Sequence, residues 1–217
     1  SFYLSKLRDA GFVKREVPIS QVNYKDSRSG RYFVTDPYLR FYYRFLAAYQ
    51  SRLALGQQEQ VTEAIGEALP EFIEANTWRE LCRRWLLDAS NNDAVPLPVE
   101  YVGSEWKSDF MIDVVGIDTQ QKSLIIGDCY WRDKPVGPKF INELARKTST
   151  ILPEHDGWSV YYTIFSASGW TAKAEEQAEE LIQKAASRAR KNWNTVGIRL
   201  VDLETLSDDL DRWSNTL

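Results

Sequence analysis

The 217-residue sequence contains only two cysteines and one histidine. Cys82 and Cys129 are too few for a disulfide framework, so we expect a reduced, intracellular chain. A structural zinc site takes four Cys or His ligands, and the sequence does not supply them. No apolar run approaches the roughly 20 residues that cross a bilayer, and the first residues lack the basic and apolar stretches of a secretory signal. We therefore expect a cytoplasmic protein without a membrane partner, and a fragment of a longer polypeptide.

The net charge of −4 is unevenly distributed along the chain. Residues 1–60 carry ten Lys and Arg against five Asp and Glu, whereas residues 61–217 carry seventeen against twenty-six. A cationic end on an acidic body predicts a local surface for phosphate groups. The sequence has no G-x-x-x-x-G-K-[ST] motif, so this chain is not expected to bind ATP in the P-loop manner.

The first part of the chain has the order helix, strand, basic hairpin tip, strand. Residues 2–10 have apolar side chains at helical spacing, and residues 31–35 alternate like a strand after a run that is extended toward Ile19. Asp36-Pro37 then predicts the start of a helix over 38–55. This order is typical of the second half of a winged helix, which contacts phosphates or, alternatively, docks proteins. The expected nucleic-acid contacts are Lys14, Arg15, Lys25, Arg28 and Arg31.

The remainder of the sequence predicts an α/β architecture. Residues 57–69 have the pattern of a polar helix or linker that Pro70 stops, and residues 71–88 that of an amphipathic helix. Continuous apolar strands separated by helices follow, which predicts a sheet covered on both faces. The expected strands are 99–107, 110–118, 123–131, 158–166 and 196–201, and the expected helices are 139–150, 171–191 and 204–213. We divide the chain into a partial winged-helix segment, 1–57, and a second domain, 58–217, in which 58–90 form connecting and first core helices.

Two of these strands hold a carboxylate where a strand normally holds apolar core. Asp113 lies within Met111–Val115, and Asp128 lies within Ile125–Trp131. A charge in a half-buried strand needs a partner, a metal ion or water. Two aspartates on adjacent strands, with a backbone carbonyl at Cys129, predict an all-oxygen site suited to Mg²⁺ or Mn²⁺. The alternative is that backbone N–H groups or water hold both carboxylates.

These residues also carry a family resemblance. An acid in an apolar strand, a short turn, and then acid-x-Lys in the next strand form the pattern of the PD-(D/E)xK nuclease superfamily. More narrowly, the chain resembles the C-terminal region of archaeal-type AAA/STAND ATPases, which joins a winged helix to a restriction-endonuclease-like domain. The segments that carry the resemblance are Gly30–Tyr32, Asp36–Phe41, Ile112–Val115, Gly127–Trp131 and Lys134–Val136. It implies a mixed sheet flanked by helices, and an ATPase domain upstream in the same polypeptide.

The resemblance assigns Asp113 and Asp128 to the metal-binding acids, but it fails at Tyr130. The family has a lysine there, which orients the attacking water and offsets charge on the phosphate. A phenol with a pKa near 10 is neutral at pH 7, and one lost cation costs on the order of 10²–10³ in rate. Lys134 or Lys107 is then the expected substitute.

The helix acid of the fold is expected at Glu80, unless Arg79 occupies that position. Three functions stay open on this sequence. The favoured one is a nuclease-like domain with impaired catalysis that binds nucleic acid or regulates a larger ATPase. The alternatives are an active Mg²⁺-dependent DNA nuclease, and a protein-interaction or sensor module without a nucleic-acid role.

Overall fold

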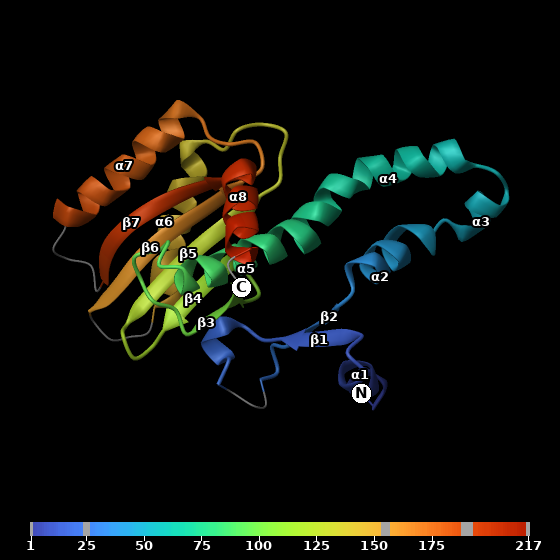
Figure 1. Ribbon diagram of the computed structural model, residues 1–217, viewed down its shortest axis with the longest axis horizontal. Helices are drawn as coiled ribbons and strands as arrows, with labels where there is room; N and C mark the ends of the chain where they lie inside the picture. The colour runs from blue at the N-terminus through green and yellow to red at the C-terminus, as the bar shows by residue number, and fades with distance from the viewer. Residues whose placement is uncertain (1, 24–26, 153–156, 188–192, 216–217) are drawn as a thin grey trace. The chain divides into compact units, whose positions relative to one another are not determined.

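The structure is a computed structural model that describes residues 2–23, 27–152, 157–187 and 193–215. It consists of two compact units, Ser1–Ile73 and Glu74–Leu217. The expected α/β class is confirmed, with a two-stranded sheet in the first unit and a five-stranded mixed sheet flanked by helices in the second (Figure 1). Within the described ranges, none of the helices combines the length and the apolar composition that a membrane span requires.

The first unit begins with the helix, strand and hairpin order that the sequence predicts. Its first elements are α1 (Phe2–Asp9), β1 (Val13–Glu16), the 3₁₀ turn η1 (Ile19–Gln21) and β2 (Arg31–Val34). Strands β1 and β2 are antiparallel, with Val13 opposite Val34 and Glu16 opposite Arg31. The extended run predicted toward Ile19 contains β1 and ends at that residue, which is buried at the start of η1.

The rest of the first unit is helical: α2 (Pro37–Phe41), the π-helical segment η2 (Tyr42–Leu46), α3 (Gln50–Ala54) and α4 (Gln58–Phe72). The Asp36 side chain caps α2 as expected, since it accepts a hydrogen bond of 3.0 Å from the Leu39 N–H. The single helix expected over 38–55 is instead interrupted between η2 and α3.

Pro70 does not stop α4, contrary to the prediction, but lies inside it. A proline removes one hydrogen bond and strains the preceding turn. Packing next to it favours the helix, because Phe72 contacts Phe41 and Phe45 with ring centroids 6.1 and 5.2 Å apart. A π-helical segment, η3 (Ile73–Trp78), follows directly, and such wide turns are common where the regular ladder is disturbed.

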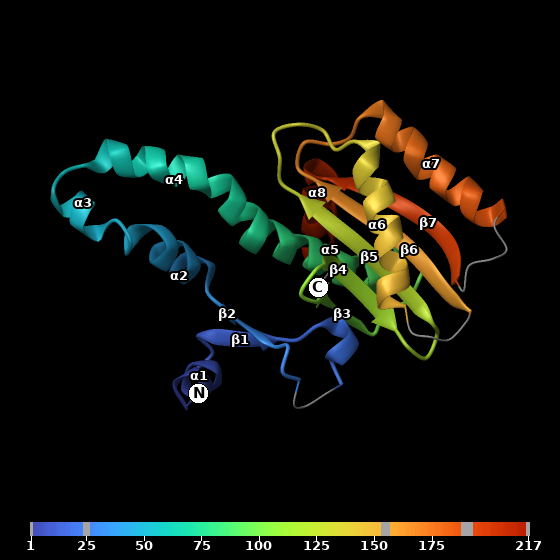
Figure 2. The same ribbon diagram turned by 180° about the vertical axis from the view of Figure 1, so that it is seen from behind.

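The second unit is built on the five-stranded sheet. Its elements after η3 are α5 (Arg79–Asn91), β3 (Tyr101–Trp106), β4 (Met111–Asp118), β5 (Ser123–Tyr130), α6 (Pro138–Ile151), β6 (Trp158–Ser166), α7 (Ala172–Ser187), β7 (Trp193–Asp202) and α8 (Leu203–Ser214). The strand order is β3-β4-β5-β6-β7, antiparallel from β3 to β5 and parallel from β5 to β7. Helices α5 and α8 cover one face of this sheet, and α6 and α7 cover the other (Figures 1 and 2).

Close packing of α5 on the sheet depends on a glycine in β4. A Cβ atom at Gly116 of β4 would lie 2.6 Å from Val99 and 3.1 Å from Leu86 of α5. Trp78, Cys82, Trp85 and Leu86 are fully buried in this layer, as the amphipathic pattern predicts. Leu81, which the same pattern places on the apolar stripe, is instead 37% exposed.

A buried acid ties α8 to its neighbours. Asp209 is 5% exposed and accepts hydrogen bonds from the indole N–H of Trp85 at 2.9 Å and from Arg199 of β7 at 3.3 Å. Arg212, one turn further along α8, donates to the other carboxylate oxygen. Three donors therefore satisfy one buried charge, which makes the packing of α5, β7 and α8 interdependent.

Asp209→Ala is expected to lower the free energy of unfolding by about 3–5 kcal/mol, because it leaves an indole N–H and two guanidinium groups without their acceptor. Urea unfolding followed by tryptophan fluorescence measures this loss. Asp208→Ala is the matched control on the next, exposed residue of α8, where we expect a change within about 0.5 kcal/mol. Equal losses in the two variants would contradict the role of Asp209.

Candidate functional site

The two strand acids are neighbours in the sheet. Val114 of β4 is the register partner of Gly127 of β5, so Asp113 and Asp128 come next to each other along these antiparallel strands. Strand β4 is irregular at this point, because its pairing with β3 shifts by one residue between Gly103 and Glu105. Such a bulge changes the direction of the side chain that it contains. Asp113 lies in this irregular part of β4 and contacts Arg79, the first residue of α5.

Asp113 is fixed by a cation and by the backbone of the next strand. Its Oδ1 lies 2.8 Å from Nε of Arg79, the first residue of α5, and its Oδ2 accepts a hydrogen bond of 3.1 Å from the Cys129 N–H. Its own carbonyl accepts from the Ser104 hydroxyl at 2.6 Å, and that hydroxyl accepts from Arg83 at 2.7 Å. With 8% of its surface exposed, Asp113 is a buried carboxylate that is fully engaged.

Asp128 is held by a lysine of α6, which covers the face of the sheet opposite to α5. The Lys147 ammonium of α6 donates to Asp128 Oδ2 at 2.6 Å and to the Met111 carbonyl at 2.8 Å. The pKa of the Asp128 carboxyl is raised from 3.8 to about 6: burial is the largest cause, the nearby charge of Asp113 also raises the pKa, and Lys147 lowers it. The second oxygen, Oδ1, is buried and has no hydrogen-bond partner of normal geometry among the described residues.

The two cysteines lie behind this acid pair and are inert. Cys82 and Cys129 are 0% and 2% exposed, and their thiols contact each other across α5 and β5. Burial raises the pKa of both thiols. Cys82 is therefore the small buried apolar residue that the sequence predicts, and Cys129 contributes its backbone N–H to Asp113 rather than its sulfur.

The cation beside Asp128 is Lys147, which was not predicted from the sequence. Tyr130 is 9% exposed, and burial, then the charges of Asp128 and Asp113, raise the pKa of its phenol, which stays neutral as expected. Lys134 and Lys107 are both exposed, and no interaction within the described residues joins either ammonium to the acid pair.

The helix contributes an arginine at the acid pair. Arg79 occupies the place beside Asp113, while Glu80, the expected helix acid, is half-buried on α5. The acid that does reach the end of β5 is Glu74, which precedes Glu80 by six residues. Its carboxylate accepts a hydrogen bond of 3.0 Å from the Trp131 N–H. Its helix also packs Trp78 against the Trp131 ring at 5.4 Å. A single sequence gives no signal for this register, because η3 shifts the helix phase.

This arrangement does not fit a divalent cation shared by the two acids. Both oxygens of Asp113 are engaged by protein groups and one oxygen of Asp128 is bonded to Lys147, so among the described residues Asp128 Oδ1 alone of these four oxygens has no hydrogen bond or ion pair. In the described part of the chain, no three His, Cys, Asp or Glu side chains group closely enough to hold a metal ion. Mg²⁺ demands near-ideal geometry with oxygen ligands, which two separate ion pairs do not provide.

The β1–β2 hairpin, which the sequence predicts to be a wing, presents two of the predicted cations to solvent. Arg28 and Arg31 are exposed, whereas Lys14 forms an ion pair of 3.0 Å with Glu16 and the half-buried Arg15 donates to the Ser27 carbonyl. Lys25 lies outside the described residues. The cationic hairpin tip is therefore present as a local feature.

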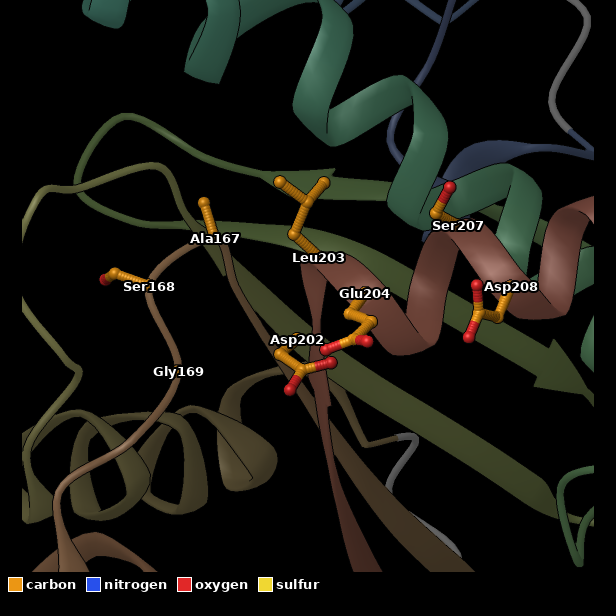
Figure 3. Close-up of a pocket in the computed structure, with 8 residues that line it drawn as sticks. All are labelled: Ala167, Ser168, Gly169, Asp202, Leu203, Glu204, Ser207 and Asp208. Atoms are coloured by element: carbon orange, nitrogen blue, oxygen red, sulfur yellow. The ribbon is translucent and has the colours of Figure 1, made fainter.

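A separate pocket of about 740 Å³ lies at the carboxyl ends of the parallel strands β6 and β7. Figure 3 shows it between the loop Ala167–Gly169 and the first turns of α8, with acidic side chains on its wall. Asp202 caps α8 by accepting from the Thr205 N–H at 2.8 Å, and this hydrogen bonding lowers the pKa of its carboxyl. With Glu204 and Asp208 beside it, the pocket has the wrong charge for a phosphate, and it contains none of the predicted site residues.

Comparison with known proteins finds one family model that matches slightly less than half of the chain. Residues 42–147 match the model of DUF234, archaea bacterial proteins of unknown function. The match covers 106 of the 217 residues and includes Glu74, Arg79, Asp113, Asp128 and, as its last residue, Lys147. The whole acid–cation cluster therefore lies within the DUF234 match.

A curated relative extends the similarity. The uncharacterised protein MJECL04 of Methanocaldococcus jannaschii is 22% identical over 166 residues, which are 75% of this chain and 36% of that protein. The chain thus spans about a third of the length of the curated relative it matches. No solved structure matches.

Lys147→Met is expected to lower the free energy of unfolding by about 2–4 kcal/mol at pH 8, close to the range for breaking a buried ion pair. The loss should be smaller at pH 5, because the Asp128 carboxyl, with a pKa of about 6 in the folded chain, is then protonated and needs no cation. Urea unfolding at both pH values measures the difference.

The pH dependence of stability follows from the raised pKa of the Asp128 carboxyl. The Asp128 carboxyl ionises near 3.8 in the unfolded chain but only near 6 in the folded one, so its contribution to stability declines as pH rises between these values. Removing Lys147 raises the folded pKa further and prolongs this decline. Arg146→Met, at a neighbouring side chain that is 77% exposed, is the control. An unchanged stability of Lys147→Met at pH 8 would contradict the assignment.

Proposed function

We propose that Glu74–Leu217 is a nuclease-like domain whose acid pair has become a structural ion-pair network, and that the chain binds nucleic acid or regulates a larger ATPase. The observation that carries this proposal is that Asp113 and Asp128 are buried, each with a cation of its own. Hydrolysis of a phosphodiester in the manner of the PD-(D/E)xK nucleases uses a metal-activated water beside acids that the substrate can approach. Carboxylates that are 8% and 4% exposed and already neutralised do not meet this requirement.

The larger protein is supported by the length of the curated relative, of which this chain spans about a third. Its ATPase character rests on the resemblance to the archaeal-type AAA/STAND ATPases, in which such a region lies C-terminal to the nucleotide-binding domain. On that basis the partner is an upstream ATPase domain of the same polypeptide, and the location is the cytoplasm.

Nucleic-acid binding is supported by the cationic wing. Arg28 and Arg31 are exposed near the end of a hairpin within residues 1–60, which carry ten Lys and Arg against five Asp and Glu. Arginine binds phosphate with a planar fork of donors, which fixes orientation as well as charge. Such contacts position a protein on the backbone without reading sequence.

The full chain is expected to bind duplex DNA at about 50 mM salt and to release it steeply as salt rises, because phosphate contacts displace condensed counterions. In the double variant Arg28→Gln/Arg31→Gln, the slope of log K against log salt should become less steep by about 2, or about 1 for each lost phosphate contact. Fluorescence anisotropy of a labelled duplex at several salt concentrations measures both quantities.

Arg8→Gln/Arg52→Gln is the matched control, since both arginines lie in the same unit and outside the wing. We expect it to leave the slope unchanged. An absence of binding at about 50 mM salt would remove the nucleic-acid role and favour a protein-interaction module.

A second candidate function, metal-dependent cleavage of nucleic acid, is favoured by one observation. The Lys147 ammonium lies 2.6 Å from Asp128, and so a cation is present although Tyr130 has replaced the family's lysine. Mg²⁺ or Mn²⁺ belongs to this candidate alone, and the Arg79–Asp113 ion pair opposes it.

The two candidates differ in a cleavage assay. We expect the wild type, with Mg²⁺ or Mn²⁺, to cut supercoiled plasmid no faster than Asp128→Asn, because the acids are closed to substrate. Agarose gels over a time course measure the rate. Metal-dependent cutting that disappears in both Asp128→Asn and Lys147→Met, while Arg146→Met retains it, would establish the second candidate and refute the first.

A further inference from the structure

Tyr130, at the position where the PD-(D/E)xK pattern has lysine, contacts a second cation, Arg132. Tyr130 and Phe140 of α6 pack with ring centroids 4.7 Å apart. The guanidinium of Arg132 lies over both rings, 4.8 Å from the Phe140 centroid and 5.3 Å from the Tyr130 centroid. A guanidinium that stacks on aromatic faces keeps its N–H groups in plane and directed outward.

Arg132 is exposed, and within the described residues it forms no ion pair with an acid. Its positive charge is therefore available to a partner, while its position is fixed by the two rings. A cation that is held before binding loses less side-chain entropy when it meets an anion.

The loop that carries Arg132 is itself anchored. Val136 is 1% exposed and pairs in a parallel bridge with Trp170, its N–H donating to the Gly169 carbonyl at 3.0 Å. The Ser168 hydroxyl donates to the Lys134 carbonyl at 2.8 Å. These bonds hold the segment between β5 and α6 against the start of α7.

The charge of this segment contrasts with its surroundings. Residues 131–147 carry five Lys and Arg against two Asp and Glu, whereas residues 74–217 as a whole carry seventeen against twenty-three. Lys134, Lys139 and Arg146 are exposed along it, the last two sharing Glu143 at 3.6 and 4.0 Å. Several exposed cations along one segment suit a partner with repeated phosphates better than a single small anion.

We infer that Arg132, stacked on Tyr130 and Phe140, is a phosphate-contact residue of the second unit and that its partner is a nucleic-acid backbone. This inference rests on the proposed nucleic-acid binding and gives it a second contact besides the wing. The neutral Tyr130 ring then serves as a platform for a cation that lies two residues further along the chain.

The test compares Arg132→Gln with the wild-type full chain on a labelled duplex and on a labelled single strand. A fourfold rise in salt, from about 50 to about 200 mM, should cost the wild type about threefold more affinity than the variant, as one lost phosphate contact predicts. Arg132→Lys should restore the salt slope but only part of the affinity, since lysine keeps the charge and loses the stacked fork.

Arg84→Gln is the matched control, because Arg84 is a 60% exposed arginine of the same unit, paired with Asp88 at 2.6 Å. It should leave both affinity and salt slope unchanged. Phe140→Leu, which retains Arg132 but removes half of its platform, should lie between the wild type and Arg132→Gln.

Each failure has its own signature. Wild-type binding with an Arg132→Gln slope equal to that of the wild type would overturn this inference and leave the wing as the nucleic-acid contact. No wild-type binding to either DNA would overturn the proposed nucleic-acid role itself. Competition by poly-glutamate as effective as that by unlabelled DNA, at equal charge, would show that Arg132 binds acidic polypeptide and would also overturn the inference.

Discussion

Two adjacent ionised carboxylates inside a sheet need compensating partners, and in the second unit each of them has a cation. Both side chains are buried away from water, and the charge of Asp113 raises the pKa of the Asp128 carboxyl. Arg79 and Lys147 solve the problem from α5 and α6, which cover opposite faces of the sheet. The acid pair therefore connects both helical layers to the central strands.

The same two ion pairs occupy the carboxylates that a metal-dependent nuclease would use for catalysis. In a nuclease of this architecture the acids would share a metal ion, whereas here each is bound to its own side chain and the bulge in β4 directs Asp113 toward α5. The positive charge that a phosphate requires then lies outside the acid pair, on Arg132 above its aromatic platform and on the wing. On the proposed function, such a domain would bind nucleic acid through these surface cations while its acid pair is structural.

Local pattern alone predicted most of the fold, since apolar runs separated by helical segments located all five strands of the large sheet and the Asp36-Pro37 pair located the start of α2. It failed at Pro70, where the aromatic packing of Phe72 outweighs the cost of the proline. The acids were also visible, because an aspartate in a buried strand stands out. Their partners were not, because Lys147 is nineteen residues from Asp128 and reaches it only through the packing of α6.

The structural role of Asp113 and Asp128 requires that protein cations, and not a shared metal ion, bind their carboxylates. Titration of Mn²⁺ into the full chain, observed through paramagnetic broadening of the carboxyl ¹³C resonances of Asp113 and Asp128, tests this directly. The ion pairs predict that both resonances stay sharp at up to millimolar Mn²⁺, at a pH above 6 where the Asp128 carboxyl is ionised. Simultaneous loss of both resonances at one equivalent of Mn²⁺, with release of Arg79 and Lys147 from their partners, would contradict it.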